Sequence, residues 1–260
     1  MVRLRLQTGA KSWKIGCIAL LTLGCARASE QPTTVASSSG AEKTIAAPVA
    51  IEVEESSVHP NVNAPYFEPD ALDTYIPILE AESREVFRRR VEILEAIGLR
   101  EGMRVADIGA GTGVFTGEIA KRVSSTGAVF AVDIAPDFLD RLRERVETEG
   151  LRNVTVVEGK ERATALAPAS IDLAFMCSTY HHLEYPKTYM RSVFRALRPG
   201  GVLVLVDFER IEGETSPALL RHVRAGKETV IAEVQDAGFS FEEETELLET
   251  NYFLRFRRPP

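Results

Sequence analysis

The clearest chemical signal in this sequence is a carboxylate followed by three glycines at alternate positions. Residues 105–113 read Val-Ala-Asp-Ile-Gly-Ala-Gly-Thr-Gly. The apolar start of this stretch predicts a buried strand, and residues 112–123 carry apolar side chains at helical spacing. Glycine permits positive φ and a close approach of the backbone to a ligand, while N–H groups at a helix N-terminus attract anions. We therefore predict a turn that binds an anionic group, although a plain tight turn has the same pattern.

A second acidic residue lies where a nucleotide would need one. Residues 129–132 predict another apolar strand, which ends in Asp133, about 20 residues beyond the last glycine. An acidic side chain at the end of the neighbouring strand is placed to hold the two hydroxyl groups of a nucleotide ribose. Asp133 therefore favours a nucleotide site over a plain turn.

The spacing of the glycines separates two classes of nucleotide. A dinucleotide fingerprint, Gly-x-Gly-x-x-Gly, would need its third glycine at Val114, and it usually has an apolar residue at the position of Asp107. The pattern Asp-x-Gly-x-Gly-x-Gly instead resembles the first motif of the class I S-adenosylmethionine-dependent methyltransferases. Residues 197–201, Leu-Arg-Pro-Gly-Gly, resemble the turn into that family's fifth strand. The resemblance covers roughly residues 85–258, and an NAD-linked oxidoreductase is the alternative that it disfavours.

The resemblance implies S-adenosylmethionine as the cofactor and gives roles to particular residues. The equivalent of Asp107 helps to position the methionine end in that family, and the equivalent of Asp133 holds the ribose. Many members have an aspartate for the adenine amino group where this chain has Lys160, so Glu161 either takes over that contact or is a solvated charge. The predicted cofactor-binding residues are Asp107, Gly109, Gly111, Thr112, Gly113, Asp133, Ile134, Glu161 and Cys177.

Two adjacent histidines follow the predicted fourth strand, in a turn expected to border both cofactor and substrate. Residues 177–184 read Cys-Ser-Thr-Tyr-His-His-Leu-Glu. Histidine can orient a nucleophile or take its proton near neutral pH, so Tyr180, His181 and His182 are the predicted catalytic residues. Capping of the next helix is the competing structural role. No metal site is predicted, because adjacent histidines with one glutamate are poorly spaced for zinc and no further Cys or His lies close in sequence.

The elements that must position these turns alternate along the chain. Strand and helix patterns follow one another up to residue 238, which predicts an α/β fold with a doubly wound, mostly parallel sheet. Two closing strands, near residues 239–241 and 252–256, have no helix between them and predict a hairpin-like antiparallel edge. The resemblance implies a seven-stranded sheet with an antiparallel last strand. We expect residues 209–227, which include His222, to form a substrate lid with the N-terminal helices.

The first residues have the pattern of an export signal. Four basic residues precede a short apolar run at residues 15–23, which is shorter than the roughly 20 residues of a membrane span. Leu-Gly-Cys ending at Cys25 resembles a bacterial lipobox, and Ala-Arg-Ala at residues 26–28 fits ordinary cleavage. We expect a signal at residues 1–24, a flexible tether at residues 25–65 and a methyltransferase domain at residues 66–260. The protein would then be periplasmic or membrane-anchored, or cytoplasmic if the signal is not used.

Composition narrows the classes of molecule that the protein is expected to act on or bind. The chain has 260 residues, a formal net charge of -7 and no sign of a second domain, which disfavours a nucleic-acid or other macromolecular acceptor. Its three cysteines are too scattered for a disulfide framework. We therefore predict a small-molecule acceptor, in the style of quinone-pathway methyltransferases, with any membrane contact made through the lipid anchor. A non-catalytic exported binding module with the same fold is the remaining alternative.

Overall fold

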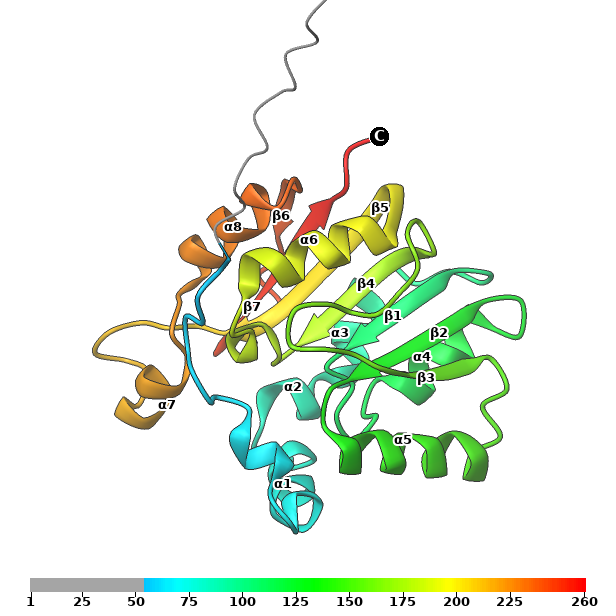
Figure 1. Cartoon of the computed structure of the whole chain (residues 1–260), viewed down its shortest axis with the longest axis horizontal. Coiled ribbons are helices and arrows are strands. Elements are labelled where there is room, and N and C mark those ends of the chain that lie inside the picture. Colours follow the sequence, from blue (N-terminus) through cyan, green and yellow to red (C-terminus); the bar gives the residue numbers. More distant parts are fainter. Residues whose placement is uncertain (1–53) are drawn as a thin grey trace, which may run out of the picture. The chain divides into compact units, whose positions relative to one another are not determined.

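The computed structural model describes residues 54–260, which belong to one compact unit (Figure 1). The predicted signal and most of the predicted tether lie outside the described residues.

A seven-stranded sheet in the order β3-β2-β1-β4-β5-β7-β6 forms the centre of this unit (Figure 1). The strands are β1 (Arg104–Ile108), β2 (Ala128–Asp133), β3 (Val154–Glu158), β4 (Ile171–Cys177), β5 (Leu197–Phe208), β6 (Ser240–Glu244) and β7 (Asn251–Arg257). Strands β1 to β5 pair in parallel, whereas β7 runs antiparallel to both of its neighbours. The predicted α/β fold, a doubly wound and mostly parallel sheet with an antiparallel last strand, is confirmed.

The two closing strands pair with each other, but β7 also inserts between β5 and β6. Three of its side chains, Phe253, Leu254 and Phe256, are fully buried, as a strand with neighbours on both sides requires. By contrast, β6 reads Ser-Phe-Glu-Glu-Glu and is largely exposed. A charged strand of this kind suits the edge of a sheet, because its charges discourage further strand pairing.

Helices cover both faces of the sheet. One face carries α3 (Arg90–Ala96), α4 (Thr116–Val123) and α5 (Pro136–Thr148), and the other carries α6 (Pro186–Ala196) and α8 (Lys227–Asp236). Neighbouring residues of a strand therefore enter different cores: Val105 packs with the α3 and α4 side chains, and Ala106 with those of α6 and α8. Burial on both faces explains why the central strands are apolar without alternation.

An N-terminal segment packs beside the carboxyl ends of the strands. It contains η1 (Ala64–Phe67), α1 (Ala71–Leu79) and α2 (Glu85–Arg88). The single helix that the pattern suggests for residues 83–97 is in fact α2 and α3, with Arg89 outside both helices. Tyr66 and Tyr75 pack with Phe138 of α5, which ties the segment to the sheet's helical layer.

Ordered contacts begin before residue 66, the predicted start of the domain. The Val58 N–H donates to the Glu184 carbonyl oxygen at 2.9 Å. The Glu55 carboxylate accepts from the backbone N–H groups of Lys187 and Thr188, at the start of α6. These contacts use polar groups, with the carboxylate satisfying free N–H groups at a helix N-terminus. A sequence pattern based on apolar spacing does not register them.

The remaining described helices are the short η2 (Tyr180–His182) and α7 (Pro217–His222). Among the helices of residues 54–260, none has both the length and the apolar character needed to cross a bilayer.

Candidate functional site

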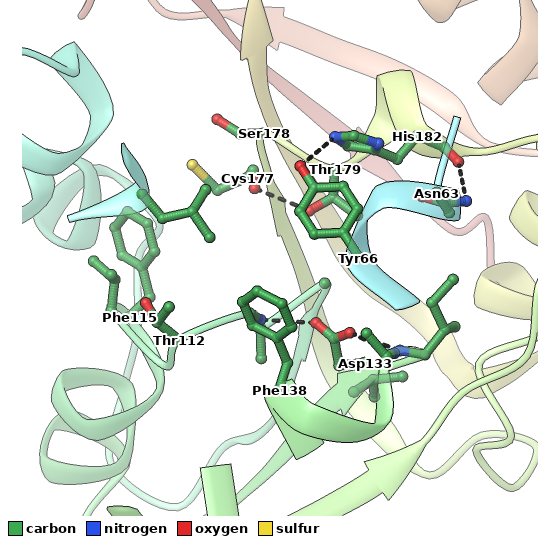
Figure 2. A pocket seen from close by; sticks show the side chains of 18 of the residues that line it. Asn63, Tyr66, Thr112, Phe115, Asp133, Phe138, Cys177, Ser178, Thr179 and His182 are labelled. Carbon is green, nitrogen blue, oxygen red and sulfur yellow. Dashed lines mark hydrogen bonds between the residues drawn. The ribbon is translucent and has the colours of Figure 1, made fainter. Parts of the chain in front are cut away.

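A pocket opens at the carboxyl ends of β1, β2 and β4 (Figure 2). Strand order reverses beside β1, which pairs with β2 on one side and β4 on the other, and this is where open α/β sheets bind ligands. The space is about 1090 Å³ when its open mouth is included. The predicted cofactor residues that line it are Gly109, Gly111, Thr112, Asp133, Ile134, Glu161 and Cys177.

The glycine turn forms one wall of this pocket. All three glycines have positive φ, and α4 begins only at Thr116 because the turn occupies the residues before it. A Cβ on Gly109 would lie 2.3 Å from the side chain of Thr179, so no larger residue fits there. Gly113 does not line the pocket; it lies against Leu142 of α5, which a Cβ would approach to 3.0 Å. Its role is to let the turn pack on the helix.

Asp133 is held rigidly at the end of β2. Its carboxylate accepts from the N–H groups of Gly111 at 2.8 Å, Ile134 at 2.8 Å and Ala135 at 3.0 Å. Burial raises the pKa of this carboxyl, and the three hydrogen bonds oppose the rise. A carboxylate has about four acceptor sites, so one remains for a ligand hydroxyl. This geometry suits the predicted ribose contact.

Asp107 lies beneath the glycine turn and does not line the pocket itself. Its side chain is buried and accepts from the Thr116 hydroxyl at 2.6 Å. Burial raises the pKa of Asp107 to about 6.

Three polar side chains face the pocket with hydrogen-bonding capacity to spare. The hydroxyl oxygens of Thr112 and Ser178 are buried and have no partner among the described residues. Buried polar atoms of this kind call for a ligand or water. Arg84, which precedes α2, uses one N–H on the Leu79 carbonyl oxygen at 2.9 Å, and a guanidinium has five N–H donors. These groups fit a ligand with both amino and carboxylate ends.

Apolar and neutral groups complete the wall. Figure 2 shows Phe138 near Asp133, and Thr112 beside Phe115 across the pocket. Burial raises the pKa of the Cys177 thiol to about 12, so this cysteine stays protonated and acts as a neutral surface. Lys160 pairs with Glu158 and lies at the pocket together with Glu161.

A second pocket lies against the first and shares part of its lining. The residues common to both are Tyr66, Leu79, Arg84, Ser178 and His182. All four histidines of the chain line the second pocket: His59, His181, His182 and His222. Sequence reasoning placed His222 in a substrate lid, and the structure brings it to this pocket with α7.

His181 is fixed by an acidic partner. Its Nδ1 lies 2.7 Å from Asp207 Oδ1, and its backbone N–H donates to Asp207 Oδ2 at 3.1 Å. Asp207 is the second-last residue of β5 and is 1% exposed. A buried carboxylate on Nδ1 sets the ring orientation and leaves Nε2 for other contacts.

His182 occupies the boundary between the two pockets. Its Nε2 lies 3.4 Å from the Tyr66 hydroxyl, its carbonyl oxygen accepts from Asn63 at 3.0 Å, and its Nδ1 is buried without a partner among the described residues (Figure 2). Burial and the neighbouring rings of His181 and His222 hold the pKa of His182 well below its usual range. The ring is therefore neutral at physiological pH.

Tyr180, a predicted catalytic residue, lies away from both pockets. Its side chain is 1% exposed, its hydroxyl donates to Glu233 at 2.8 Å, and it lines neither pocket. Arg224 pairs with the same glutamate, so the three side chains tie η2 to α8. Consecutive residues of a short helix point in different directions, and Tyr180 points into the core while the two histidines face the pocket.

Arg84, Tyr66 and Asn63 were missed by sequence reasoning. They come from the N-terminal segment, which carries no motif. Because this segment is distant in sequence from the glycine turn, no local pattern predicts that its residues reach the pocket. All three line the first pocket.

Comparisons with known proteins agree with this geometry. Residues 105–201 match a family described as methyltransferase domain. The chain is 29% identical over 122 residues to the ubiquinone/menaquinone biosynthesis C-methyltransferase UbiE of Erwinia tasmaniensis, covering 46% of this chain and 49% of that protein. It is 28% identical over 130 residues to the demethylmenaquinone methyltransferase of Staphylococcus aureus, covering 50% and 52%. The chain thus spans about half the length of these curated relatives.

A solved structure extends the likeness beyond the matched motif. A SAM-dependent methyltransferase from Aquifex aeolicus superposes with a TM-score of 0.60 at 25% identity, covering 74% of this chain and 94% of that one. The region that matches the methyltransferase-domain family contains the glycine turn, Asp133 and residues 197–201, which begin β5.

Proposed function

We infer that this chain, which carries a methyltransferase domain on the fold of class I S-adenosylmethionine-dependent methyltransferases, is an enzyme that methylates a small molecule. The observation that carries the inference is the first pocket, where the glycine turn meets Asp133 at the switch in strand order. The comparisons support S-adenosylmethionine as the cofactor and do not favour an NAD-linked oxidoreductase or a binding module.

The residues of the first pocket support contacts with the ribose and the methionine end of this cofactor. Asp133 would accept from the ribose hydroxyls. Thr112, Ser178 and Arg84 would bind the amino and carboxylate groups, with the buried Asp107 balancing the positive charge from below. When bound, S-adenosylmethionine supplies a methyl group on a sulfonium, which needs no further activation. The protein's main tasks are therefore to align donor and acceptor and to exclude water, which together supply on the order of 7–11 kcal/mol.

The second pocket is the proposed acceptor site, because it shares a wall with the first at Tyr66, Ser178 and His182. The acceptor atom forms the new bond to carbon with its own electron pair. The electrons of the carbon–sulfur bond would remain on the sulfur of the bound cofactor, and a proton carried by the acceptor would leave to water or a nearby base. The two curated relatives are named as a ubiquinone/menaquinone biosynthesis C-methyltransferase and a demethylmenaquinone methyltransferase, which supports a ring-bearing acceptor as the first class to test.

Calorimetry on the full chain tests the cofactor. We expect S-adenosylmethionine and its demethylated product, S-adenosylhomocysteine, to bind, NAD not to bind, and Asp133→Ala to abolish binding of both sulfur nucleotides. The matched control is Asp140→Asn, an exposed carboxylate on α5 outside the pocket. Failure of either sulfur nucleotide to bind would contradict the proposed function. Transfer of a labelled methyl group to demethylmenaquinone or to other phenols and quinols would separate an enzyme from a binding module.

We also propose that residues 1–24 direct export, on the pattern of basic residues followed by a short apolar run. The mature protein would begin at Cys25 with a lipid anchor, or at Ser29 after ordinary cleavage. Cell fractionation with mass spectrometry of the N-terminus distinguishes these outcomes. An intact Met1 on a cytoplasmic protein would overturn the proposal.

A further inference from the structure

We propose that His181, His182 and His222 form a binding site for a divalent transition-metal ion such as Zn²⁺, at the acceptor end of the paired pockets. One ring nitrogen of each histidine lies within 4.8 Å of the other two. Three imidazoles with room for a fourth ligand are a donor set that zinc and its neighbours in the first transition row accept. Sequence spacing hides this set, because about 40 residues separate His182 from the third histidine.

His181 has the arrangement expected of a metal-bound histidine. Its Nδ1 is engaged by Asp207 at 2.7 Å, which leaves Nε2 as its free ligand atom. Asp207 is itself fixed, since it accepts from the backbone N–H groups of His181 at 3.1 Å and Phe208 at 2.8 Å. A carboxylate behind a ligating histidine orients the ring and makes its other nitrogen a better ligand.

His182 supplies an independent observation. Its Nδ1 is buried and has no hydrogen-bond partner among the described residues, although Tyr66 lies beside the other nitrogen of the ring. A buried polar atom without a partner is costly unless something satisfies it. A metal ion among the three rings provides that partner.

His222 closes the set from a different element. It ends α7, and its ring centroid lies 4.9 Å from that of His181 and 5.0 Å from that of His182. Tetrahedral coordination with bonds of about 2.1 Å brings ligand nitrogens to roughly 3.4 Å apart. His222 is exposed in the structure, so its side chain is less confined by packing than the buried ring of His181.

The metal's role, unlike its binding, rests on the proposed function. Three protein ligands leave a position open, as in catalytic rather than structural metal sites. The three histidines line the second pocket, so an acceptor bound in that pocket would be able to occupy the open position. An acceptor hydroxyl or thiol bound there would lose its proton to water because the metal lowers its pKa, and the resulting anion would take the methyl group. The acceptor class would be a phenol, enol or thiol.

Metal binding is tested directly on the full chain after chelation. We expect one Co²⁺ or Zn²⁺ per chain by calorimetry, with the visible absorption of cobalt bound to nitrogen ligands. His222→Ala removes an exposed ligand without disturbing the core, and we expect at least a tenfold loss of affinity. Asp207→Asn should weaken binding by about 10–100-fold. The matched control is His59→Ala, which changes the second pocket outside the three-histidine set and should leave metal affinity unchanged.

Two outcomes would overturn the proposal: a wild-type chain that binds neither ion, or equal affinity in wild type and His222→Ala. Binding of S-adenosylhomocysteine, measured on the same samples, keeps the two proposals apart. If the nucleotide binds and the metal does not, only the metal site fails. If the metal binds and the nucleotide does not, the proposed methyltransferase function fails and the site stands.

Discussion

At the scale of single residues, the charge of Asp107 is expected to lower the stability of the ligand-free protein and to strengthen cofactor binding. The pKa of its buried carboxyl is raised from 3.8 to about 6, so the folded protein holds this proton more tightly than the unfolded chain. The stabilisation that comes from this tighter proton binding is fully present below about pH 4. It is lost as the pH rises through 6, which lowers the free energy of unfolding by about 3 kcal/mol. We predict that Asp107→Asn makes the ligand-free protein more stable at pH 7 and weakens cofactor binding.

Urea unfolding at pH 4, 5 and 7 measures the change in stability, and calorimetry with S-adenosylhomocysteine measures the change in binding affinity. Asparagine can still accept from the Thr116 hydroxyl, so the substitution removes the charge and keeps the hydrogen bond. Asp140→Asn, at an exposed position on α5, serves as the control and should leave stability within about 0.5 kcal/mol. A pH dependence that is the same in wild type and Asp107→Asn would contradict the prediction.

Gly109 gives a second residue-scale prediction. It has a φ of +70°, and a Cβ there would lie 2.3 Å from Thr179. Gly150 has a similar φ of +64° with nothing within 4 Å, so it isolates the cost of the backbone conformation. We predict that Gly150→Ala loses about 1 kcal/mol, whereas Gly109→Ala loses a further 1–3 kcal/mol from the steric overlap and also loses cofactor affinity. Denaturant unfolding of the two variants tests this prediction. Equal losses of unfolding free energy would show that the Thr179 side chain moves to accommodate the Cβ.

Residue identities were predictable from the sequence where function depends on local geometry. The glycine turn and Asp133 follow from strand ends and glycine spacing, so their positions needed no knowledge of distant contacts. The burial of Tyr180 was not predictable, because neighbouring residues of η2 face different sides. His222 and Arg84 reach the pockets through tertiary packing of α7 and the N-terminal segment, which no local pattern encodes.

At the scale of elements, Glu85 anchors α2 to the loop between β6 and β7. Its carboxylate accepts from the N–H groups of Glu249 at 2.6 Å and Thr250 at 2.8 Å, and from the side chains of Thr250 and Asn251. Burial alone would raise the pKa of Glu85, but these hydrogen bonds lower it to about 2. The contact matters for function because Val86 and Phe87 of the same helix line the cofactor pocket.

We predict that Glu85→Gln lowers the free energy of unfolding by about 2 kcal/mol at pH 7, a value reduced for solvent screening near the surface. The carboxylate now accepts hydrogen bonds from two backbone N–H groups. In the glutamine variant the side-chain NH₂ would face one of these N–H groups, so that donor would meet donor. Because the folded pKa is lowered, the wild-type advantage holds above the unfolded value of 4.5 and fades as the pH falls toward 2. Glu95→Gln, at an exposed position on α3, is the control in denaturant unfolding. A difference that persists at pH 2 would contradict an electrostatic origin.

The mostly parallel character of the sheet was predictable because apolar strands alternate with helices, whereas the placement of β7 between β5 and β6 was not. The apolar character of β7 distinguishes it from the acidic β6, and this contrast is the signal that places β6 at the edge. Helical periodicity also does not register the break between α2 and α3.

At the scale of the whole molecule, the N-terminal segment joins the two pockets. Tyr66 and Arg84 line both of them, while the segment's own core is a small cluster around Ala71 and Phe138. Segments with little buried apolar contact open more readily than the central sheet, and a ligand that contacts them suppresses that opening. Sequence patterns could not reveal this coupling, because residues 54–65 dock through polar groups and backbone hydrogen bonds.

Hydrogen exchange on the full chain should make this coupling visible. We predict that S-adenosylhomocysteine slows exchange in residues 61–88 as well as in the glycine turn, because Asn63, Leu79 and Arg84 line the pocket that it fills. Peptides from β6, at the far edge of the sheet, provide the internal control and should be unchanged. Protection confined to residues 109–135 would mean that the cofactor binds without the N-terminal segment. In that case the acceptor pocket, whose wall this segment builds, would form independently of the cofactor.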